Sequence, residues 1–185
     1  PYPMRGRSGN GKPTTPCAMS FADGLAAPTP TSKDLVFVQS GNYTAPNATI
    51  ALNANQVLVG NAVSLTTAIG DAGITLAPDS VAPTINASTT PTLTNAGNVI
   101  VLAGGNLVEY FAITNTAGAA IAGTSAGSGT SNIHGIAVNN TIGNGVSLTA
   151  NLGTVNFSNL AVTTTSGVAF AATGAAIYVD YAHTP

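Results

Sequence analysis

One motif occurs three times in this chain, as FAITNTAG (residues 111–118), IAVNNTIG (residues 136–143) and LAVTTTSG (residues 160–167). Each copy has an apolar residue, Ala, a β-branched apolar residue, two polar residues, Thr, a variable residue and Gly. Alternating apolar residues are typical of a strand with one buried face, and the final glycine predicts a tight corner. Because the copies begin 25 and then 24 residues apart, the motif predicts a solenoid of stacked turns.

A period in the twenties, rich in Val, Ile, Thr and Asn, predicts an all-β fold, namely a right-handed parallel β-helix (β-solenoid) of about seven coils. Alternate side chains of each strand point inward, so equivalent apolar residues of successive coils stack into one continuous core. The predicted repeat core consists of Phe111, Ile113, Ile136, Val138, Leu160 and Val162.

Charged residues are scarce, with four Lys or Arg and six Asp or Glu among 185 residues. Nucleic acids and anionic lipid surfaces are bound through clusters of Lys and Arg, so neither is an expected partner. The longest apolar stretch, residues 99–113, is interrupted by Gly104, Gly105, Asn106 and Glu109, which argues against membrane insertion. Hydrophobic residues still make up 44% of the chain, enough to fill a core.

The domain organisation follows from the positions of prolines and apolar runs. Residues 1–32 are predicted to form an N-terminal arm and capping segment, with a possible short capping helix before Pro28, and residues 33–185 the β-helix. Further strands are expected at residues 35–38, 50–52, 57–59, 74–76 and 99–101, and a loop at residues 77–94. Residues 177–179 still have a strand pattern, so the β-helix is predicted to be open at its C-terminal end.

Polar residues at equivalent motif positions are predicted to form ladders along one corner of the solenoid. The candidate polar ladder comprises Asn115, Asn140, Thr116, Thr141 and Thr165. The asparagines would hydrogen-bond to each other and to turn backbone, and the threonines would stack at about 4.8 Å. Threonine is also a common exposed strand residue, whereas a regular hydroxyl array would suit a glycan or ice. Asn139 stands where the other two copies have Thr114 and Thr163, so the hydroxyl array is interrupted, and ice binding is the minor alternative.

Catalytic residues are not predicted. β-Helix enzymes that act on glycans use clusters of carboxylates, and glycoside hydrolysis usually needs a pair. Glu109 is the single formal charge between residues 80 and 179 and is expected to be exposed at a strand edge. Asp71 and Asp79 are expected to be solvated turn residues. A cleft lined by all three carboxylates would instead favour an enzyme.

Metal and cofactor sites are not predicted either. His134 and His183 lie 49 residues apart, without Cys or carboxylate at ligand spacing. The segment Gly9-Asn10-Gly11 lacks the following Lys-Ser/Thr of a phosphate-binding loop. Serines are too numerous for spacing alone to reveal a Ser–His–acid arrangement. The single cysteine, Cys17, excludes an internal disulfide but leaves the redox compartment open.

The first sixty residues resemble the opening of pectin-lyase-like right-handed parallel β-helix proteins, in which a short helix plugs the first coil. The resemblance is carried by Gly9-Asn10-Gly11-Lys12, a possible helix at residues 21–27, Asp34-Leu35-Val36-Phe37-Val38 and Gly41-Asn42-Tyr43. Residues 50–60 are similar to the second coil of bacterial autotransporter-like surface β-helix proteins. Lys33 departs from the glycine often found there, and a proline-rich link precedes it. Since the superfamily includes lyases, hydrolases, tailspikes and adhesins, the resemblance implies fold more than function.

These observations predict a non-catalytic, exported or cell-surface bacterial β-helix that acts as an adhesive or structural shaft. An open coil end exposes unpaired backbone and apolar core, so the expected partners are further coils, either of a longer β-helix or of another copy. Glycans or a host surface are further expected partners. A head-to-tail extracellular fibre subunit is the nearest alternative, followed by a glycan-binding or glycan-processing β-helix.

Overall fold

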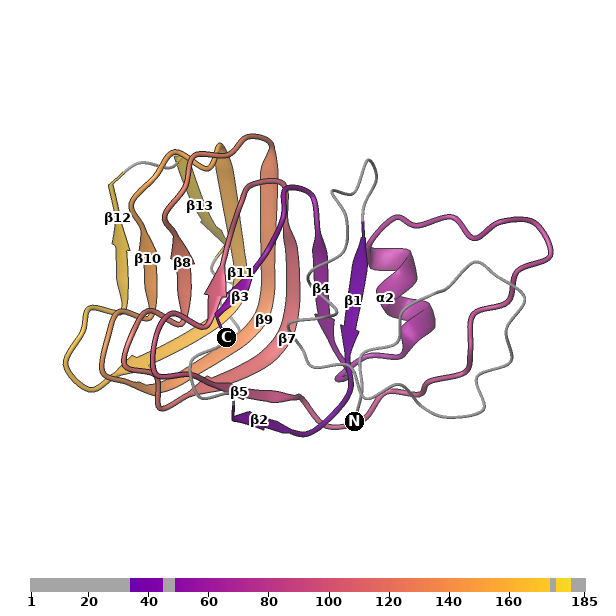
Figure 1. Ribbon diagram of the computed structural model, residues 1–185, viewed down its shortest axis with the longest axis horizontal. Coiled ribbons are helices and arrows are strands. Elements are labelled where there is room, and N and C mark those ends of the chain that lie inside the picture. The colour runs from indigo at the N-terminus through magenta and orange to yellow at the C-terminus, as the bar shows by residue number, and fades with distance from the viewer. Residues whose placement is uncertain (1–33, 45–48, 174–175, 181–185) are drawn as a thin grey trace.

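The computed structural model describes residues 34–44, 49–173 and 176–180. They form a parallel β-solenoid of about six turns, one fewer than the repeat length predicts, with one short helix (Figure 1). The possible capping helix and the N-terminal arm lie outside the described residues.

Each full turn has three short faces. The first face stacks six strands in the order β1 (Leu35–Val38), β4 (Val57–Gly60), β7 (Leu107–Thr114), β9 (Thr130–Thr141), β11 (Thr154–Thr164) and β13 (Ala176–Asp180). The second face consists of β2 (Asn42–Thr44), β5 (Thr92–Thr94) and the second halves of β7, β9 and β11. The third face contains β3 (Ile50–Ala51), β6 (Ile100–Val101), β8 (Ile121–Gly123), β10 (Val146–Leu148) and β12 (Phe170–Ala172).

The three longest strands bend where the first face meets the second. Tyr110, Gly135 and Asn159 occupy the bend in β7, β9 and β11, and their φ angles are 61°, 63° and 49°. This left-handed conformation is unusual for a residue other than glycine, and it interrupts the alternation of side chains between the two faces. A single continuous strand therefore supplies two sides of the turn.

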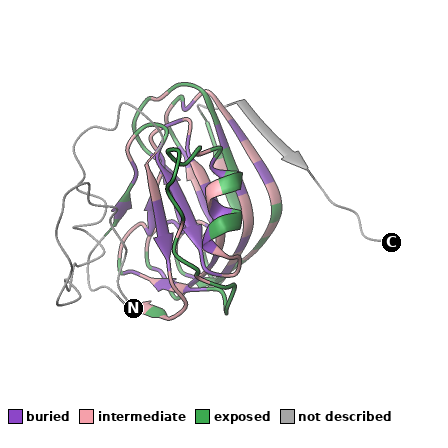
Figure 2. Cartoon of the chain, turned by 90° about the vertical axis from the view of Figure 1, so that its right-hand side faces the viewer, coloured by how far each residue is buried: buried purple, intermediate pink, exposed green. Residues whose placement is uncertain are grey.

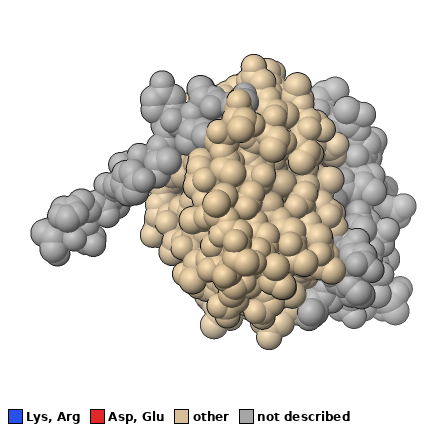
Figure 3. All heavy atoms as spheres, turned by 90° about the vertical axis from the view of Figure 1, so that its left-hand side faces the viewer, with Lys and Arg blue, Asp and Glu red and all other residues tan. Residues whose placement is uncertain are grey.

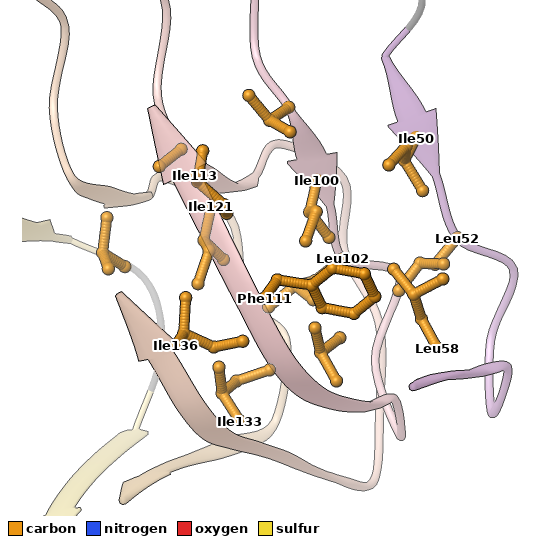
Figure 4. Close-up of a cluster of buried hydrophobic side chains, with 14 of the residues drawn as sticks. Ile50, Leu52, Leu58, Ile100, Leu102, Phe111, Ile113, Ile121, Ile133 and Ile136 are labelled. Carbon is orange, nitrogen blue, oxygen red and sulfur yellow. The ribbon is translucent and has the colours of Figure 1, made fainter. Parts of the chain in front are cut away.

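The repeat core lies in register along the solenoid. Phe111, Ile136 and Leu160 occupy one position in successive turns, and Ile113, Val138 and Val162 occupy the next inward position. The first two residues of each set are fully buried, while Leu160 and Val162, one turn from the C-terminal end, are half-buried against the same cluster. Side chains from all three faces meet in this core (Figure 4).

The glycine that ends each motif copy marks a corner where successive turns approach closely. A Cβ atom at Gly143 would overlap the carbonyl oxygen of Gly118, and one at Gly167 would overlap that of Gly143. Backbone is stacked directly on backbone at these positions, so any side chain would force the turns apart. The motif therefore requires glycine there for space.

An insertion at residues 61–91 interrupts the second turn. It contains helix α2 (Leu65–Asp71), whose N-terminus is capped by Ser64, because the Ser64 side chain accepts a hydrogen bond from the Thr67 N–H at 3.1 Å. The strand expected at residues 74–76 is wrong, since residues 72–91 contain no strand or helix. The loop expected at residues 77–94 ends three residues earlier, where β5 begins.

The insertion covers the outer side of the first face. Leu65, Ala68 and Ala72, at helical spacing, pack with Phe37, Val57 and Val59 in a second apolar cluster. The opposite side of α2 is exposed (Figure 2). The outer surface of β1 and β4 is therefore buried, whereas the same surface further along the solenoid is not covered by α2.

Candidate functional site

A polar row crosses the outer side of the first face beside the insertion. Glu109 of β7, His134 of β9 and Ser158 of β11 are direct register neighbours. The residues that precede them, Val108, Ile133 and Phe157, point into the core, so the three polar side chains point outward. Glu109, His134 and Ser158 are called the outer row below.

Glu109 is buried at the start of the outer row. The prediction of an exposed strand-edge residue is wrong, because only 8% of Glu109 is exposed and β7 lies inside the sheet. Its neighbour on the other side is Val59, which is covered by the insertion. Burial, and secondarily the charge of Asp71, raises the pKa of Glu109 to about 7. Its Oε2 atom has no hydrogen-bond partner among the described residues.

His134 and Ser158 are hydrogen-bonded to each other. The distance between His134 Nδ1 and Ser158 Oγ is 2.8 Å. Both side chains are half-buried and therefore reachable from solvent. This distance is within the range required for proton transfer between a hydroxyl and an imidazole.

Tyr110 packs against His134 and holds the imidazole from the side. The two rings meet edge to face, with centroids 5.3 Å apart and an interplanar angle of 87°. A Cβ atom at Gly135 would lie 2.8 Å from Tyr110 Cδ1, so the absence of a side chain there leaves room for the phenol ring. Burial, followed by the charges of Glu109 and Asp71, raises the pKa of Tyr110.

The other ionisable residues considered in the sequence analysis are not part of the outer row. Asp71 ends α2 and is exposed, although its charge acts on Glu109, and Asp79 is exposed within the insertion. Cys17 and His183 lie outside the described residues. Within the described ranges there is no group of three or more His, Cys, Asp or Glu suited to a metal ion. Over the same residues, no helix has the length and hydropathy needed to cross a membrane.

The predicted asparagine ladder differs from the observed arrangement. Asn115 and Asn140 are exposed and have φ angles of 53° and 55°, and no hydrogen bond between described residues joins them. The left-handed backbone turns both side chains away from the stack. An asparagine pair does occur on the outer face, where Asn156 Nδ2 donates to Asn132 Oδ1 at 2.9 Å.

The predicted exposed threonine array is also wrong. Thr116 and Thr141 are fully buried, and only Thr165 is exposed. A register shift after Val162 places Thr164, in place of Thr165, opposite Thr141. Of the two buried threonines, Thr116 satisfies a backbone group, since its Oγ1 donates to the Gly118 carbonyl at 2.9 Å. The Thr141 Oγ1 is buried without a hydrogen-bond partner among the described residues. The regular hydroxyl surface that would suit ice is therefore missing at these positions.

A buried polar corner was not predicted from the sequence. Asn106 is almost fully buried, and its backbone N–H donates to Ser131 Oγ of the next turn at 3.1 Å. Its carboxamide makes four hydrogen bonds of 2.8–3.1 Å to backbone groups of Ala103, Gly104, Asn53 and Gln56. This side chain ties the second turn to the third, in the way that the motif asparagines were expected to do.

Burial along the third face decreases at β12, the last strand that the structure describes on this face. Ile100, Ile121, Val146 and Phe170 form one register row through the third face. The first three are fully buried, whereas Phe170 is 36% exposed. Phe170 packs edge to face on Phe157, with ring centroids 5.2 Å apart, and its other side meets solvent.

The described surface has no Lys or Arg side chain. All four Lys and Arg residues of the chain lie within residues 1–33, outside the described residues. The face shown in Figure 3 carries no charged residue among those that the structure describes. Binding at the described surface therefore depends on amide, hydroxyl, aromatic and acidic groups.

Comparisons with known proteins give no relative of this chain. No protein-family model, no curated protein and no solved structure matches it. The fold is therefore assigned from the parallel strand registers, and the candidate site from the side chains that those registers bring together.

Proposed function

We propose that this β-solenoid is a shaft of an exported bacterial cell-surface protein, extended at its C-terminal end by further stacked turns. The observation that carries the proposal is the third-face row, in which Val146 is fully buried and Phe170 is 36% exposed. A further turn would bury Phe170 and pair the free edge of β12, as each turn does for the one before it.

The adhesive part of the proposal concerns the outer surface. On the part of the surface that the structure describes, exposed amides and hydroxyls without Lys or Arg favour neutral partners, such as uncharged glycans on a host surface, over anionic ones. The resemblance of residues 9–60 to pectin-lyase-like and autotransporter-like β-helices supports the same role. The family relationship itself is part of this proposal.

The open end can take its next turn from the same protein or from a second copy. The first case is a longer shaft, which we favour, and the second is a head-to-tail fibre. Both bury the same residues, so the state of association in solution separates them.

The experiment compares wild type with Phe170→Ser by light scattering, electron microscopy and binding of an apolar dye, over a range of concentrations. Val81→Ser is the matched control, because Val81 is 92% exposed but lies in the insertion. If the chain is part of a longer shaft, we expect a monomer. Its binding of the apolar dye should decrease in Phe170→Ser and stay unchanged in Val81→Ser. Rods that grow with concentration and are lost in Phe170→Ser indicate the fibre. A monomer whose dye binding is equal in all three proteins would overturn the stacking surface.

A further inference from the structure

We propose that Ser158 and His134 form a nucleophile–base pair, assisted by Glu109 on the neighbouring strand, that hydrolyses neutral carboxylic esters on the outer face of the solenoid. This activity goes beyond the role of a shaft. The expectation of no catalysis was based on the scarcity of carboxylates for glycan cleavage, which does not bear on a serine nucleophile.

The pair has the geometry of an activated serine. Ser158 Oγ lies 2.8 Å from His134 Nδ1, so the hydroxyl can donate its proton to the imidazole. Tyr110 packs edge to face on the imidazole and restricts its rotation. Both reacting side chains are half-buried on a solvent-facing surface, so a substrate can reach them.

Glu109 supplies the third member of the arrangement as a positioning residue. It lies on the strand next to His134, on the side opposite Ser158. Its Oε2 is buried and has no partner among the described residues, although buried polar atoms are normally hydrogen-bonded. A carboxylate so placed is available to the imidazolium that forms when His134 takes the serine proton.

The surroundings of the outer row define the substrate class. Asp71 and Glu109 bring negative charge, and Lys and Arg are absent from the described residues. An anionic substrate would be repelled and would find no Lys or Arg to bind among the described residues. The site therefore suits an uncharged acyl ester, for which 4-nitrophenyl acetate is a convenient probe.

The reaction balances without a cofactor. As the bond between Ser158 Oγ and the carbonyl carbon of the ester forms, the hydroxyl proton passes to His134 Nδ1. The bond between that carbon and the alcohol oxygen then breaks, and the departing alcohol takes the proton from His134. Water then attacks the acyl-serine while His134 accepts a water proton. The Oγ–carbon bond breaks, the proton returns to Ser158, and the free acid leaves.

The competing explanation is that His134 and Ser158 are an unreactive pair of stacked polar side chains. Asn132 and Asn156 form such a pair on the same two strands. The experiment is therefore covalent labelling of the full chain by a fluorophosphonate, with the modified residue located by mass spectrometry of peptides. The serine oxygen displaces fluoride from phosphorus, and an ordinary serine does not react at a comparable rate. Because the label is located in the wild-type protein, this result does not depend on whether any variant folds.

Three variants complete the experiment, each checked for its β-sheet circular dichroism. Ser158→Ala is expected to abolish labelling, and His134→Gln to slow labelling and 4-nitrophenyl acetate hydrolysis about 100-fold, since a general base contributes at least that factor. Ser147→Ala is the matched control, because Ser147 is a half-buried strand serine whose register neighbours are Ala122 and Ala171. It is expected to react like wild type.

The positioning role of Glu109 is tested by the pH dependence of labelling. Glu109→Gln is expected to slow labelling about tenfold above pH 7, where the wild-type carboxylate is ionised, and to change it little below pH 6. An equal effect at every pH would contradict the positioning role. Absence of label at Ser158, or labelling of His134→Gln at the wild-type rate, would overturn the proposal and leave the pair as a structural contact.

Discussion

At the scale of single residues, Glu109 couples the stability of the solenoid to pH. Its pKa is raised from 4.5 to about 7 in the folded protein, first by burial and then by Asp71. Between these values the unfolded chain loses a proton that the folded chain retains. Stability is therefore full below pH 4.5, falls as the pH rises toward 7, and is constant above, with a total loss on the order of 2–3 kcal/mol.

Glu109→Gln keeps the shape of the side chain and removes the charge. We expect urea unfolding of this variant to show little loss of stability between pH 4.5 and 8, so that it exceeds wild type by about 1–3 kcal/mol at pH 8. Asp79→Asn is the control, because Asp79 is exposed in the insertion. If wild type were equally stable at pH 4.5 and 8, Glu109 would not be buried as described.

The outer row was predictable from the sequence, whereas the burial of Glu109 was not. Glu109, His134 and Ser158 each stand two residues before a motif copy, which begins at Phe111, Ile136 and Leu160. Equal offsets in a solenoid mean neighbouring positions in space, so the spacing that revealed the core also aligned these side chains. The exposure of Glu109 depends on the insertion, which packs across the sheet from a separate part of the sequence.

At the scale of elements, two glycines that each follow an isoleucine are expected to respond oppositely to substitution. A Cβ at Gly143 would overlap the Gly118 carbonyl of the preceding turn, whereas a Cβ at Gly70 in α2 would meet nothing within 4 Å. We expect Gly143→Ala to destabilise the fold by about 1–3 kcal/mol, because the turns must separate. Gly70→Ala is expected to stabilise it by about 0.5–1 kcal/mol through helix propensity. Thermal unfolding of both variants tests this, and equal shifts would contradict the close stacking.

The buried asparagine makes a second prediction at this scale. Asn106→Ala removes four hydrogen bonds to backbone groups of two turns, of which those of Gly104 and Gln56 are buried and those of Ala103 and Asn53 are partly buried. We expect a loss of about 2–4 kcal/mol in urea unfolding, since buried polar groups without partners are costly. Asn139→Ala, at an exposed motif position, is expected to change stability by less than about 0.5 kcal/mol. Similar losses in the two variants would argue against a special role for Asn106.

Helix α2 shows where sequence patterns are ambiguous for an element. Ser64 as N-cap and the apolar spacing Leu65, Ala68 and Ala72 are helix signals, yet Ile74-Thr75-Leu76 alternates like a strand. The strand reading fails because Ile74 packs against the outside of the solenoid as part of the insertion, with no neighbouring strand to pair with. Periodicity identifies a buried face but not the surface that buries it.

At the scale of the whole molecule, the repeat determines the stacking order but not the point at which a turn is interrupted. The register of residues 107–172 follows the motif period closely, so the core could be predicted position by position. The second turn contains an insertion, residues 61–91, between β4 and β5. The repeat motif does not indicate where such an insertion begins and ends. The asymmetric covering of the outer face follows from that insertion.

A solenoid is held together by contacts between neighbouring turns, so the cost of a core substitution depends on its position along the rod. Phe111 is fully buried between the turns of β4 and β9, whereas Phe170 packs on Phe157 and is exposed on its other side. We expect Phe111→Ala to cost about 3–5 kcal/mol, and Phe170→Ala about 1–2 kcal/mol because much of its ring is already in water. Hydrogen exchange should then show loss of protection throughout the central turns for Phe111→Ala, and only at β12 and its neighbours for Phe170→Ala. If Phe170→Ala were as costly as Phe111→Ala, the C-terminal end would be a sealed part of the core, and the stacking surface proposed for the shaft would not exist.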